Sequence, residues 1–173
     1  MTNRYNNRRQ YFDELARTSK EYLSEYIRSY KGLSPGSLVL EIGCGEGGNL
    51  VPFAEIGCKV CGIDISTGKI DNARRFFREK GLDGEFICSD FVRCEIEQYV
   101  GRYDIIIIHD VIEHIDPEDK DEFMSRAKAL LRPSGGDHGS FSSVEDAFWR
   151  TSADMQKPTL PSAVHTPSSR KMV

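Results

Sequence analysis

Hydrophobic residues recur at every third or fourth position between residues 8 and 30, which is the spacing of an amphipathic helix. The Pro35-Gly36 pair ends this pattern. From there to about residue 134, short apolar runs alternate with longer amphipathic segments. The pattern predicts helices over 8–30, 48–56, 66–80 and 117–131, and strands over 38–42, 59–63, 84–89 and 103–109.

The last predicted strand contains four consecutive isoleucines, at positions 105–108. Such a run is typical of a strand that is buried on both faces of a parallel sheet. Two predicted helices also start with capping residues: Ser66 before the third, and Asp116 followed by Pro117 before the fourth. The alternation of strand and helix predicts an α/β fold with a doubly wound, Rossmann-like and mostly parallel sheet.

Composition narrows the class of protein. The chain has 173 residues, 39% of them hydrophobic, which suits one globular domain. Its net charge is −4, so it has no excess of basic residues of the kind that nucleic-acid-binding proteins have. Its apolar runs are too short to span a membrane. The start of the chain has no signal-peptide pattern, and an odd number of cysteines, five, favours a reducing environment. We therefore expect a cytoplasmic protein without nucleic-acid or membrane partners; its oligomeric state stays open.

The last part of the chain has a different composition. All 14 isoleucines lie at or before Ile115, and 16 of the 39 residues from 135 to 173 are Ser, Thr, Pro or Gly. Such a segment buries too little apolar area to offset the entropy lost on ordering it. We expect a domain over residues 1–136, with a helix over 8–30 and a core over 37–134. The tail over 137–173 is expected to be disordered or out of frame.

The out-of-frame hypothesis comes from back-translation of residues 137–157. With permitted codons and a shift of one nucleotide, one allowed reading begins with an apolar strand directly after the glycines at 135 and 136. A naturally divergent tail is the alternative. The nucleotide sequence distinguishes the two.

A glycine-rich loop follows the first predicted strand. Gly43, Gly45 and Gly48 satisfy G-x-G-x-x-G, the pattern with which Rossmann folds bind a dinucleotide such as NAD. Two acids argue against NAD, since Glu41 precedes the first glycine by two residues and Glu46 lies inside the loop. Carboxylates there would repel a pyrophosphate but attract an ammonium or a sulfonium. S-adenosylmethionine (SAM) carries both cations, so the loop favours SAM, and NAD binding is the alternative.

Acidic residues also follow the second and third predicted strands. Asp64 lies 21 residues after Gly43, where its carboxylate can accept two hydrogen bonds from a ribose diol. Asp90-Phe91 offers an acceptor for an adenine amino group and a ring to pack on the adenine face. Because ligands of open α/β sheets bind at the carboxyl ends of the strands, these residues are predicted to gather beside the glycine loop.

The chain resembles class I SAM-dependent methyltransferases, in particular bacterial enzymes acting on small molecules, over motifs at 38–49, 62–66, 88–91 and 103–115. The segment 130–133 is similar to a further signature of that family. The resemblance implies that the glycine loop holds the methionine part of SAM, with Asp64 at the ribose, Asp90-Phe91 at the adenine and His109 beside the sulfonium. The cofactor-binding residues expected in this way are Glu41, Gly43, Cys44, Gly45, Asn49, Asp64, Ile65, Asp90, Phe91 and His109.

Two further groups of residues have chemistry of their own. His109 is a candidate general base for methyl transfer. Together with Asp110, Glu113 and His114 it also forms a cluster of metal-ligating types, but we expect no metal site. Cys58-x-x-Cys61 has no second cysteine pair to complete a zinc site, and its odd spacing on a strand points the two thiols to opposite faces.

The expected function is SAM-dependent methyl transfer to an unidentified small-molecule acceptor. A complete member of the resembled family continues with a fifth strand and a further pair, in the order 3-2-1-4-5-7-6, and the sequence has no convincing counterpart of these strands. We therefore expect a C-terminally truncated chain with the strand 105–108 at an open, aggregation-prone edge. A catalytically inactive cofactor-binding fragment is the alternative function, and an NAD-binding Rossmann protein is the third.

Overall fold

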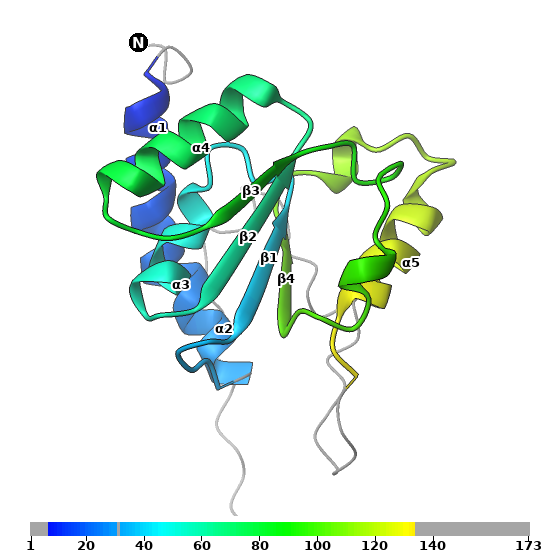
Figure 1. Ribbon diagram of the computed structural model, residues 1–173, viewed down its shortest axis with the longest axis horizontal. Helices are drawn as coiled ribbons and strands as arrows, with labels where there is room; N and C mark the ends of the chain where they lie inside the picture. Colours follow the sequence, from blue (N-terminus) through cyan, green and yellow to red (C-terminus); the bar gives the residue numbers. More distant parts are fainter. Residues whose placement is uncertain (1–6, 31, 134–173) are drawn as a thin grey trace, which may run out of the picture.

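A computed structural model describes residues 7–30 and 32–133 of the chain, which form a sheet flanked by helices (Figure 1). The sheet has four strands in the order β3-β2-β1-β4, and every neighbouring pair is parallel. Within these two ranges, no helix is long and apolar enough to cross a membrane.

The elements are α1 (Arg8–Thr18), η2 (Ser19–Leu23), α2 (Ser24–Tyr30), β1 (Leu38–Ile42), η3 (Gly48–Leu50), α3 (Val51–Glu55), β2 (Lys59–Asp64), α4 (Thr67–Glu79), β3 (Glu85–Cys88), η4 (Glu97–Tyr99), β4 (Ile105–Ile108), η5 (Ile112–His114) and α5 (Lys120–Leu130).

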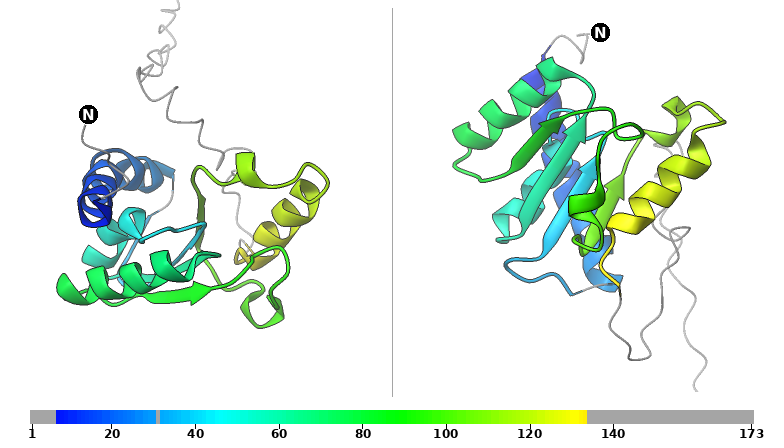
Figure 2. Two further views of the ribbon diagram at one scale, coloured as in Figure 1. Left: turned by 90° about the horizontal axis from the view of Figure 1, so that it is seen from above. Right: turned by 45° about the vertical axis from the view of Figure 1, so that its right-hand side comes forward.

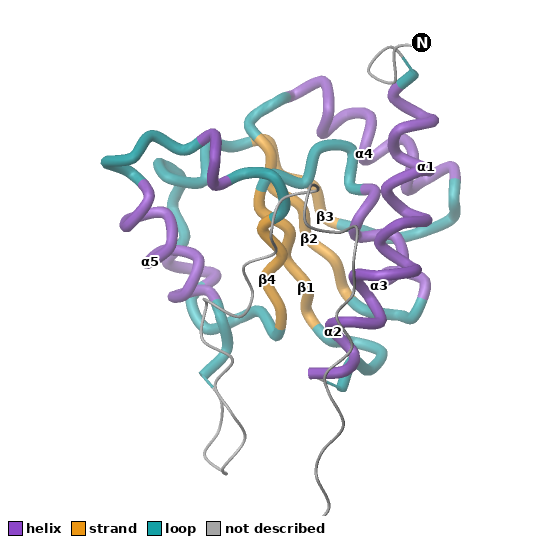
Figure 3. The backbone as a smooth tube through the Cα atoms, turned by 180° about the vertical axis from the view of Figure 1, so that it is seen from behind, coloured by secondary structure: helices purple, strands orange, loops and turns teal. Residues whose placement is uncertain are grey.

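The two faces of the sheet are covered by different helices, which makes the fold doubly wound, as the sequence predicts. Helices α1 to α4 lie on one side of the sheet and α5 lies on the other (Figures 2 and 3). Side chains alternate between two apolar clusters along each strand, so Val39 packs with α1, α3 and α4, whereas Leu40 packs with α5. Cys58 and Cys61 belong to opposite clusters, which confirms that the C-x-x-C pair serves strand packing.

The four isoleucines of β4 alternate between the same two clusters. Ile107 is buried and the other three are partly buried, so the prediction of a strand that is packed on both faces is confirmed. Among residues 7–30 and 32–133, β4 pairs with β1 and ends the sheet. The predicted tail over 137–173 lies outside the described residues, and the division of the chain at residue 136 stays a prediction.

The predicted helix over 8–30 is helical throughout, but it contains a feature that periodicity did not predict. Its middle, Ser19–Leu23, is a π-helical turn between α1 and α2. The hydroxyl of the buried Ser19 donates a hydrogen bond of 2.8 Å to the carbonyl oxygen of Asn49, which follows the glycine loop. The π turn thus lies where the N-terminal helix crosses the loop, and such turns occur frequently at functional sites.

Several predicted element bounds and one predicted cap differ from the structure. The last helix begins at Lys120 rather than at Pro117, because Asp116 accepts a backbone hydrogen bond from Asp119 and closes a separate turn first. Ser66 occupies the predicted capping position of α4, but its side chain makes no capping hydrogen bond. The third and fourth strands are each shorter than the predicted ranges 84–89 and 103–109.

Gly43 turns the chain sharply at the end of β1. Its φ of 75° lies in the left-handed region, and its N–H donates to the carbonyl oxygen of Ile63 at 2.7 Å. A Cβ atom on Gly43 would lie 2.2 Å from Cγ2 of Val111, which follows β4. The ends of β1 and β4 can therefore approach each other only because this residue has no side chain.

We expect Gly43→Ala to lower the free energy of unfolding by about 3 kcal/mol, from the left-handed backbone and the clash with Val111 together. Gly45→Ala is the matched control, because Gly45 has a φ of 55° but open space within 4 Å of the added Cβ. It should cost about 1 kcal/mol, from the backbone alone. Urea denaturation measures both, and equal losses would contradict the close approach at Gly43.

Candidate functional site

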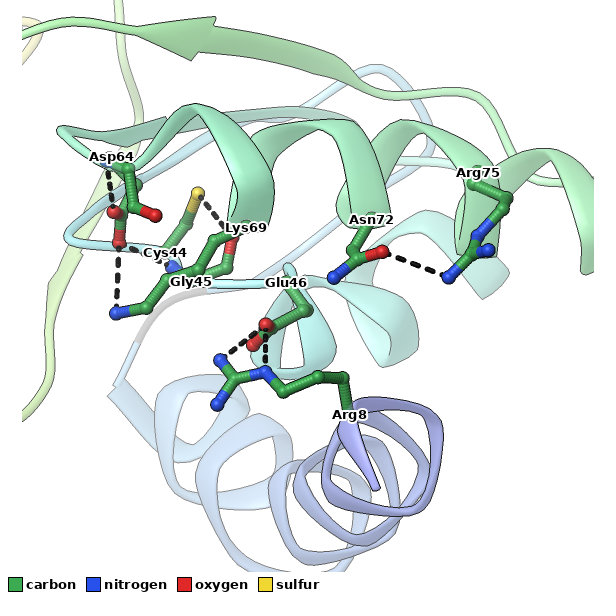
Figure 4. A network of polar contacts seen from close by, with 9 residues as sticks. Arg8, Cys44, Gly45, Glu46, Asp64, Lys69, Asn72 and Arg75 are labelled. Carbon is green, nitrogen blue, oxygen red and sulfur yellow. Dashed lines mark hydrogen bonds and ion pairs between the residues drawn. The ribbon is translucent and has the colours of Figure 1, made fainter. Parts of the chain in front are cut away.

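The carboxyl ends of the four parallel strands bring the predicted site residues to one edge of the sheet. Glu41 lies near the end of β1, Asp64 ends β2, Asp90 follows β3, and His109 follows β4. Between β1 and η3, the glycine loop crosses this edge, and its residues contact Asp64 (Figure 4). The structure therefore places these residues at the strand ends that the sequence predicts, and it brings Asp64 into contact with the glycine loop.

Asp64 is fixed against the glycine loop. Its Oδ2 accepts a hydrogen bond of 2.9 Å from the N–H of Gly45, and its Oδ1 accepts one of 2.8 Å from the N–H of Ser66. Nζ of Lys69 lies 4.0 Å from Oδ2. Because each carboxylate oxygen has a second lone pair, the oriented Asp64 can still accept hydrogen bonds from a diol.

Glu41 lies behind the loop rather than on its surface. Its side chain is 1% exposed, and Oε1 accepts a hydrogen bond of 2.8 Å from Nδ2 of Asn49. Its Oε2 is buried and has no hydrogen-bond partner among the described residues. Burial raises the pKa of Glu41 to about 8. The hydrogen bond from Asn49 lowers the pKa, but by less than burial raises it. In the free protein this carboxyl therefore holds a proton at neutral pH.

Glu46 is also buried, at 1% exposure, but its charge is compensated. The Nε of Arg8 donates a hydrogen bond of 2.6 Å to its Oε1. Figure 4 shows the Glu46 side chain pointing toward Arg8, and the Asp64 side chain pointing toward Gly45 and Lys69. The two acids that argue against a pyrophosphate are thus a protonated carboxyl and one paired with Arg8. Asp64 differs from both, because backbone N–H groups orient its two oxygens at the loop.

Cys44 contributes to the loop through its backbone. Its N–H donates to the carbonyl oxygen of Ile63 at 3.0 Å, beside the similar bond from Gly43. Its side chain is buried at 4% exposure, and burial raises the pKa of its thiol. The thiol is therefore not a nucleophile at neutral pH.

The residues after β2 and β3 differ in what they expose. Asp90 accepts a hydrogen bond of 3.0 Å from the N–H of Val92. The ring of Phe91 is 5% exposed and packs edge-on against Phe123 at a centroid distance of 5.2 Å. Ile65, in contrast, is 72% exposed next to Asp64. Ile65 therefore contributes exposed apolar surface at this edge, and the predicted contact between Phe91 and an adenine stays a prediction.

His109 lies at the end of β4, with 28% of its side chain exposed. Its Nδ1 is 3.4 Å from Oδ2 of Asp110. Asp110 has a φ of 51°. Among residues 7–30 and 32–133, it is the one non-glycine residue with a positive φ. Such strained positions cluster at functional sites, and here the strain places a carboxylate beside an imidazole that can exchange a proton.

Two cations of the site were not predicted from the sequence. Arg8 is 38 residues from its partner Glu46, so spacing carries no signal for the pair. Lys69 lies in the first turn of α4, five residues after Asp64, and this short spacing was the available signal. In the described part of the chain, no group of three or more His, Cys, Asp or Glu residues is arranged to hold a metal ion.

Comparison with known proteins gives consistent matches. Residues 39–135 match the family described as "Methyltransferase domain". The ubiquinone biosynthesis O-methyltransferase of Actinobacillus pleuropneumoniae serotype 7 (strain AP76) is 32% identical over 114 residues, which cover 64% of this chain and 48% of that protein. The protein of the same name from Rhodopseudomonas palustris (strain BisB5) is 33% identical over 113 residues, covering 64% and 43%. The chain thus spans about half the length of the curated relatives it matches.

A solved structure shows the same arrangement. Magnesium protoporphyrin IX methyltransferase from Synechocystis PCC 6803, with bound SAM, superposes with a TM-score of 0.55 at 28% sequence identity. The match covers 67% of this chain and 54% of that one. The four-stranded parallel sheet of the described residues therefore has the Rossmann-like topology of a known methyltransferase fold.

The raised pKa of Glu41 predicts a pH dependence of stability. Between the ordinary value of 4.5 and about 8, the unfolded chain has released this proton while the folded chain retains it. The free energy of unfolding should therefore fall as the pH rises through this window, and Glu41→Gln should remove the fall. Denaturation at about pH 5 and about pH 8 measures it, with the exposed Glu97→Gln as the control. An unchanged slope in Glu41→Gln would contradict the buried, protonated carboxyl.

Proposed function

The chain belongs to the methyltransferase domain family of class I SAM-dependent enzymes, and we propose that it transfers the methyl group of SAM to a small-molecule acceptor. SAM is the cofactor of this family. The observation that carries the proposal is Asp64, oriented by the N–H groups of Gly45 and Ser66 at the edge where the four strands end. An oriented carboxylate with free lone pairs suits the ribose diol of such a cofactor.

The other residues of the loop support the same ligand. Gly45 has a left-handed φ of 55° and open space where a side chain would be, so a ligand can approach its backbone closely. Glu41 has a buried oxygen, Oε2, without a partner among the described residues. A cation near Glu41 would favour loss of its proton, so a ligand with an ammonium group suits this carboxyl better than a pyrophosphate does.

The bound cofactor supplies an electrophilic methyl group. The loop and Asp64 would hold the cofactor in one orientation, and orientation supplies much of the rate in such a transfer. We propose that His109 takes the proton of the acceptor, with the carboxylate of Asp110 stabilising the resulting imidazolium across 3.4 Å. A base of this kind is needed only if the acceptor is protonated at the working pH.

The nature of the acceptor is supported by the relatives. The curated relatives are named for O-methylation in ubiquinone biosynthesis, and the structural relative for magnesium protoporphyrin IX. Both names indicate small molecules, and the first supports an oxygen atom as the methyl acceptor. We propose a hydroxyl-bearing small molecule on this ground, for a chain that spans about half of these relatives.

Cofactor binding without methyl transfer is a second candidate function. One observation favours it: among the described residues, the sheet ends at β4, so these residues supply no strand beyond His109. Cofactor binding and methyl transfer are therefore two separate properties of the chain, and each needs its own measurement. NAD binding, the third reading of the glycine loop, is tested in the same binding experiment.

The binding experiment uses S-adenosylhomocysteine and isothermal titration calorimetry. We expect the chain to bind this product and not NAD. Asp64→Ala should weaken the binding by about 1.5–3 kcal/mol, because charge-assisted hydrogen bonds to the ligand are lost. Asp71→Ala is the matched control, since Asp71 is an exposed acid on α4 whose ion-pair partner, Arg74, lies on the same helix.

Two results would contradict the assignment. One is binding of NAD in place of S-adenosylhomocysteine. The other is an equal affinity for S-adenosylhomocysteine in the unmodified chain, in Asp64→Ala and in Asp71→Ala.

The transfer experiment follows methyl transfer from SAM to a panel of small molecules with oxygen, nitrogen and sulfur nucleophiles. We expect hydroxyl acceptors to be methylated, and His109→Gln to lower kcat by about a hundredfold through loss of the base. His114→Gln, an exposed histidine of η5, is the control and should retain kcat. Binding of S-adenosylhomocysteine with no methylation in the unmodified chain would favour the second candidate, and an unchanged kcat in His109→Gln would rule out this base.

A further inference from the structure

The N-terminal helix reaches the glycine loop through an ion pair. Arg8, in the first turn of α1, donates from Nε to Oε1 of Glu46 at 2.6 Å, and its Nη2 contacts the same oxygen. The Glu46 side chain is 1% exposed, whereas that of Arg8 is 31% exposed. A charge buried in the loop is therefore compensated by a cation that a different segment of the chain presents from the protein surface (Figure 4).

Glu46 depends on this cation. Its Oε2 is buried and has no hydrogen-bond partner among residues 7–30 and 32–133. Removal of one member of a buried pair is strongly destabilising, because it leaves an uncompensated charge. Glu46 lies between Gly45 and Gly47, which have φ values of 55° and 79°. The N–H of Gly47 donates to the carbonyl oxygen of Cys44 at 2.8 Å, so Glu46 lies in a turn that its own backbone closes. Arg8 is therefore the cation that holds the Glu46 side chain of this turn against the N-terminal helix.

The same face of the helix contacts the rest of the loop. Gly48 packs so closely on the helix that an added Cβ would lie 2.8 Å from the carbonyl oxygen of Phe12 and 2.6 Å from Cβ of Leu15. The hydroxyl of Ser19 then donates to the carbonyl oxygen of Asn49 at 2.8 Å. Positions 8, 12, 15 and 19 share one face of a helix, so a single surface contacts residues 46–49 in order.

Both ends of the loop segment are also bonded to site residues. Gly45 donates to Asp64, and Asn49 donates to Glu41. A shift of residues 46–48 would therefore move the partners of both carboxyl groups. Arg8 does not need to touch a ligand to influence its binding.

We propose that Arg8 is a positioning residue, which through Glu46 holds residues 45–49 in the conformation that binds the cofactor. The proposal rests on the proposed function for the identity of the ligand. The role of Arg8 in ordering the loop, however, rests only on the ion pair and the helix contacts. These two parts can be tested apart.

The test compares Arg8→Gln with Arg9→Gln. Arg9 is the neighbouring arginine of α1, but it pairs with Asp13 and Glu79, which are exposed and outside the loop. We expect Arg8→Gln to raise the Kd for S-adenosylhomocysteine about tenfold and to accelerate hydrogen exchange at amides 45–49. Arg9→Gln should change neither.

Two further variants separate positioning from loss of fold. Arg8→Lys retains the cation and should recover most of the affinity. The double variant Arg8→Gln/Glu46→Gln removes the uncompensated charge and should bind more tightly than Arg8→Gln alone. A purely structural loss would show neither recovery.

The proposal is overturned if Arg8→Gln and Arg9→Gln give the same Kd and the same exchange rates, or if the double variant binds no better than Arg8→Gln. If the unmodified chain binds no S-adenosylhomocysteine, the proposed function fails. The exchange rates of amides 45–49 in the free variants then still decide whether Arg8 orders the loop.

Discussion

Two backbone hydrogen bonds to one carbonyl oxygen determine the geometry on which the site depends. The N–H groups of Gly43 and Cys44 both donate to Ile63, at 2.7 and 3.0 Å, and so tie the start of the glycine loop to the end of β2. The turn that allows this requires a left-handed residue without a Cβ, because Val111 closes in from the end of β4. As a result, the loop and the ends of three strands meet at one point, and Asp64 lies within hydrogen-bonding reach of Gly45.

The polarity of the site is arranged in two layers. Glu41, behind the loop, and Glu46, within it, are both buried, each with one oxygen that has no partner in the described part of the chain. Neither carries a free negative charge in the absence of ligand, because burial protonates Glu41 and Arg8 pairs with Glu46. The ligand side of the loop is left to Asp64, whose two oxygens are oriented by backbone N–H groups. The site can therefore hold buried acids without the repulsion that three ionised carboxylates would cause.

Much of this arrangement could be predicted from local sequence patterns. The glycine spacing, the acids after consecutive strands and the isoleucine run each report on neighbours along the chain, and a parallel sheet then brings the strand ends together. The start of α5 was mispredicted because Asp116-Pro117 is equally compatible with a turn before the helix. The π turn at Ser19 and the pair between Arg8 and Glu46 depend on how two distant segments cross, and periodicity contains no information on such crossings. Glu46, expected from the sequence to attract a cationic ligand, is instead paired with Arg8 of the same chain.

The most direct test of the cofactor site is a map of amide chemical shifts in the ¹⁵N-labelled chain during titration with S-adenosylhomocysteine. If the glycine loop and Asp64 form the site, the shifts should concentrate at residues 43–49 and 64–66, with smaller changes near 90 and 109. The opposite edge of the sheet, where residues 57–61 and 81–85 line an open groove, should stay unchanged. Shifts centred on that groove, or no shifts in the loop at saturating ligand, would contradict the assignment of the site.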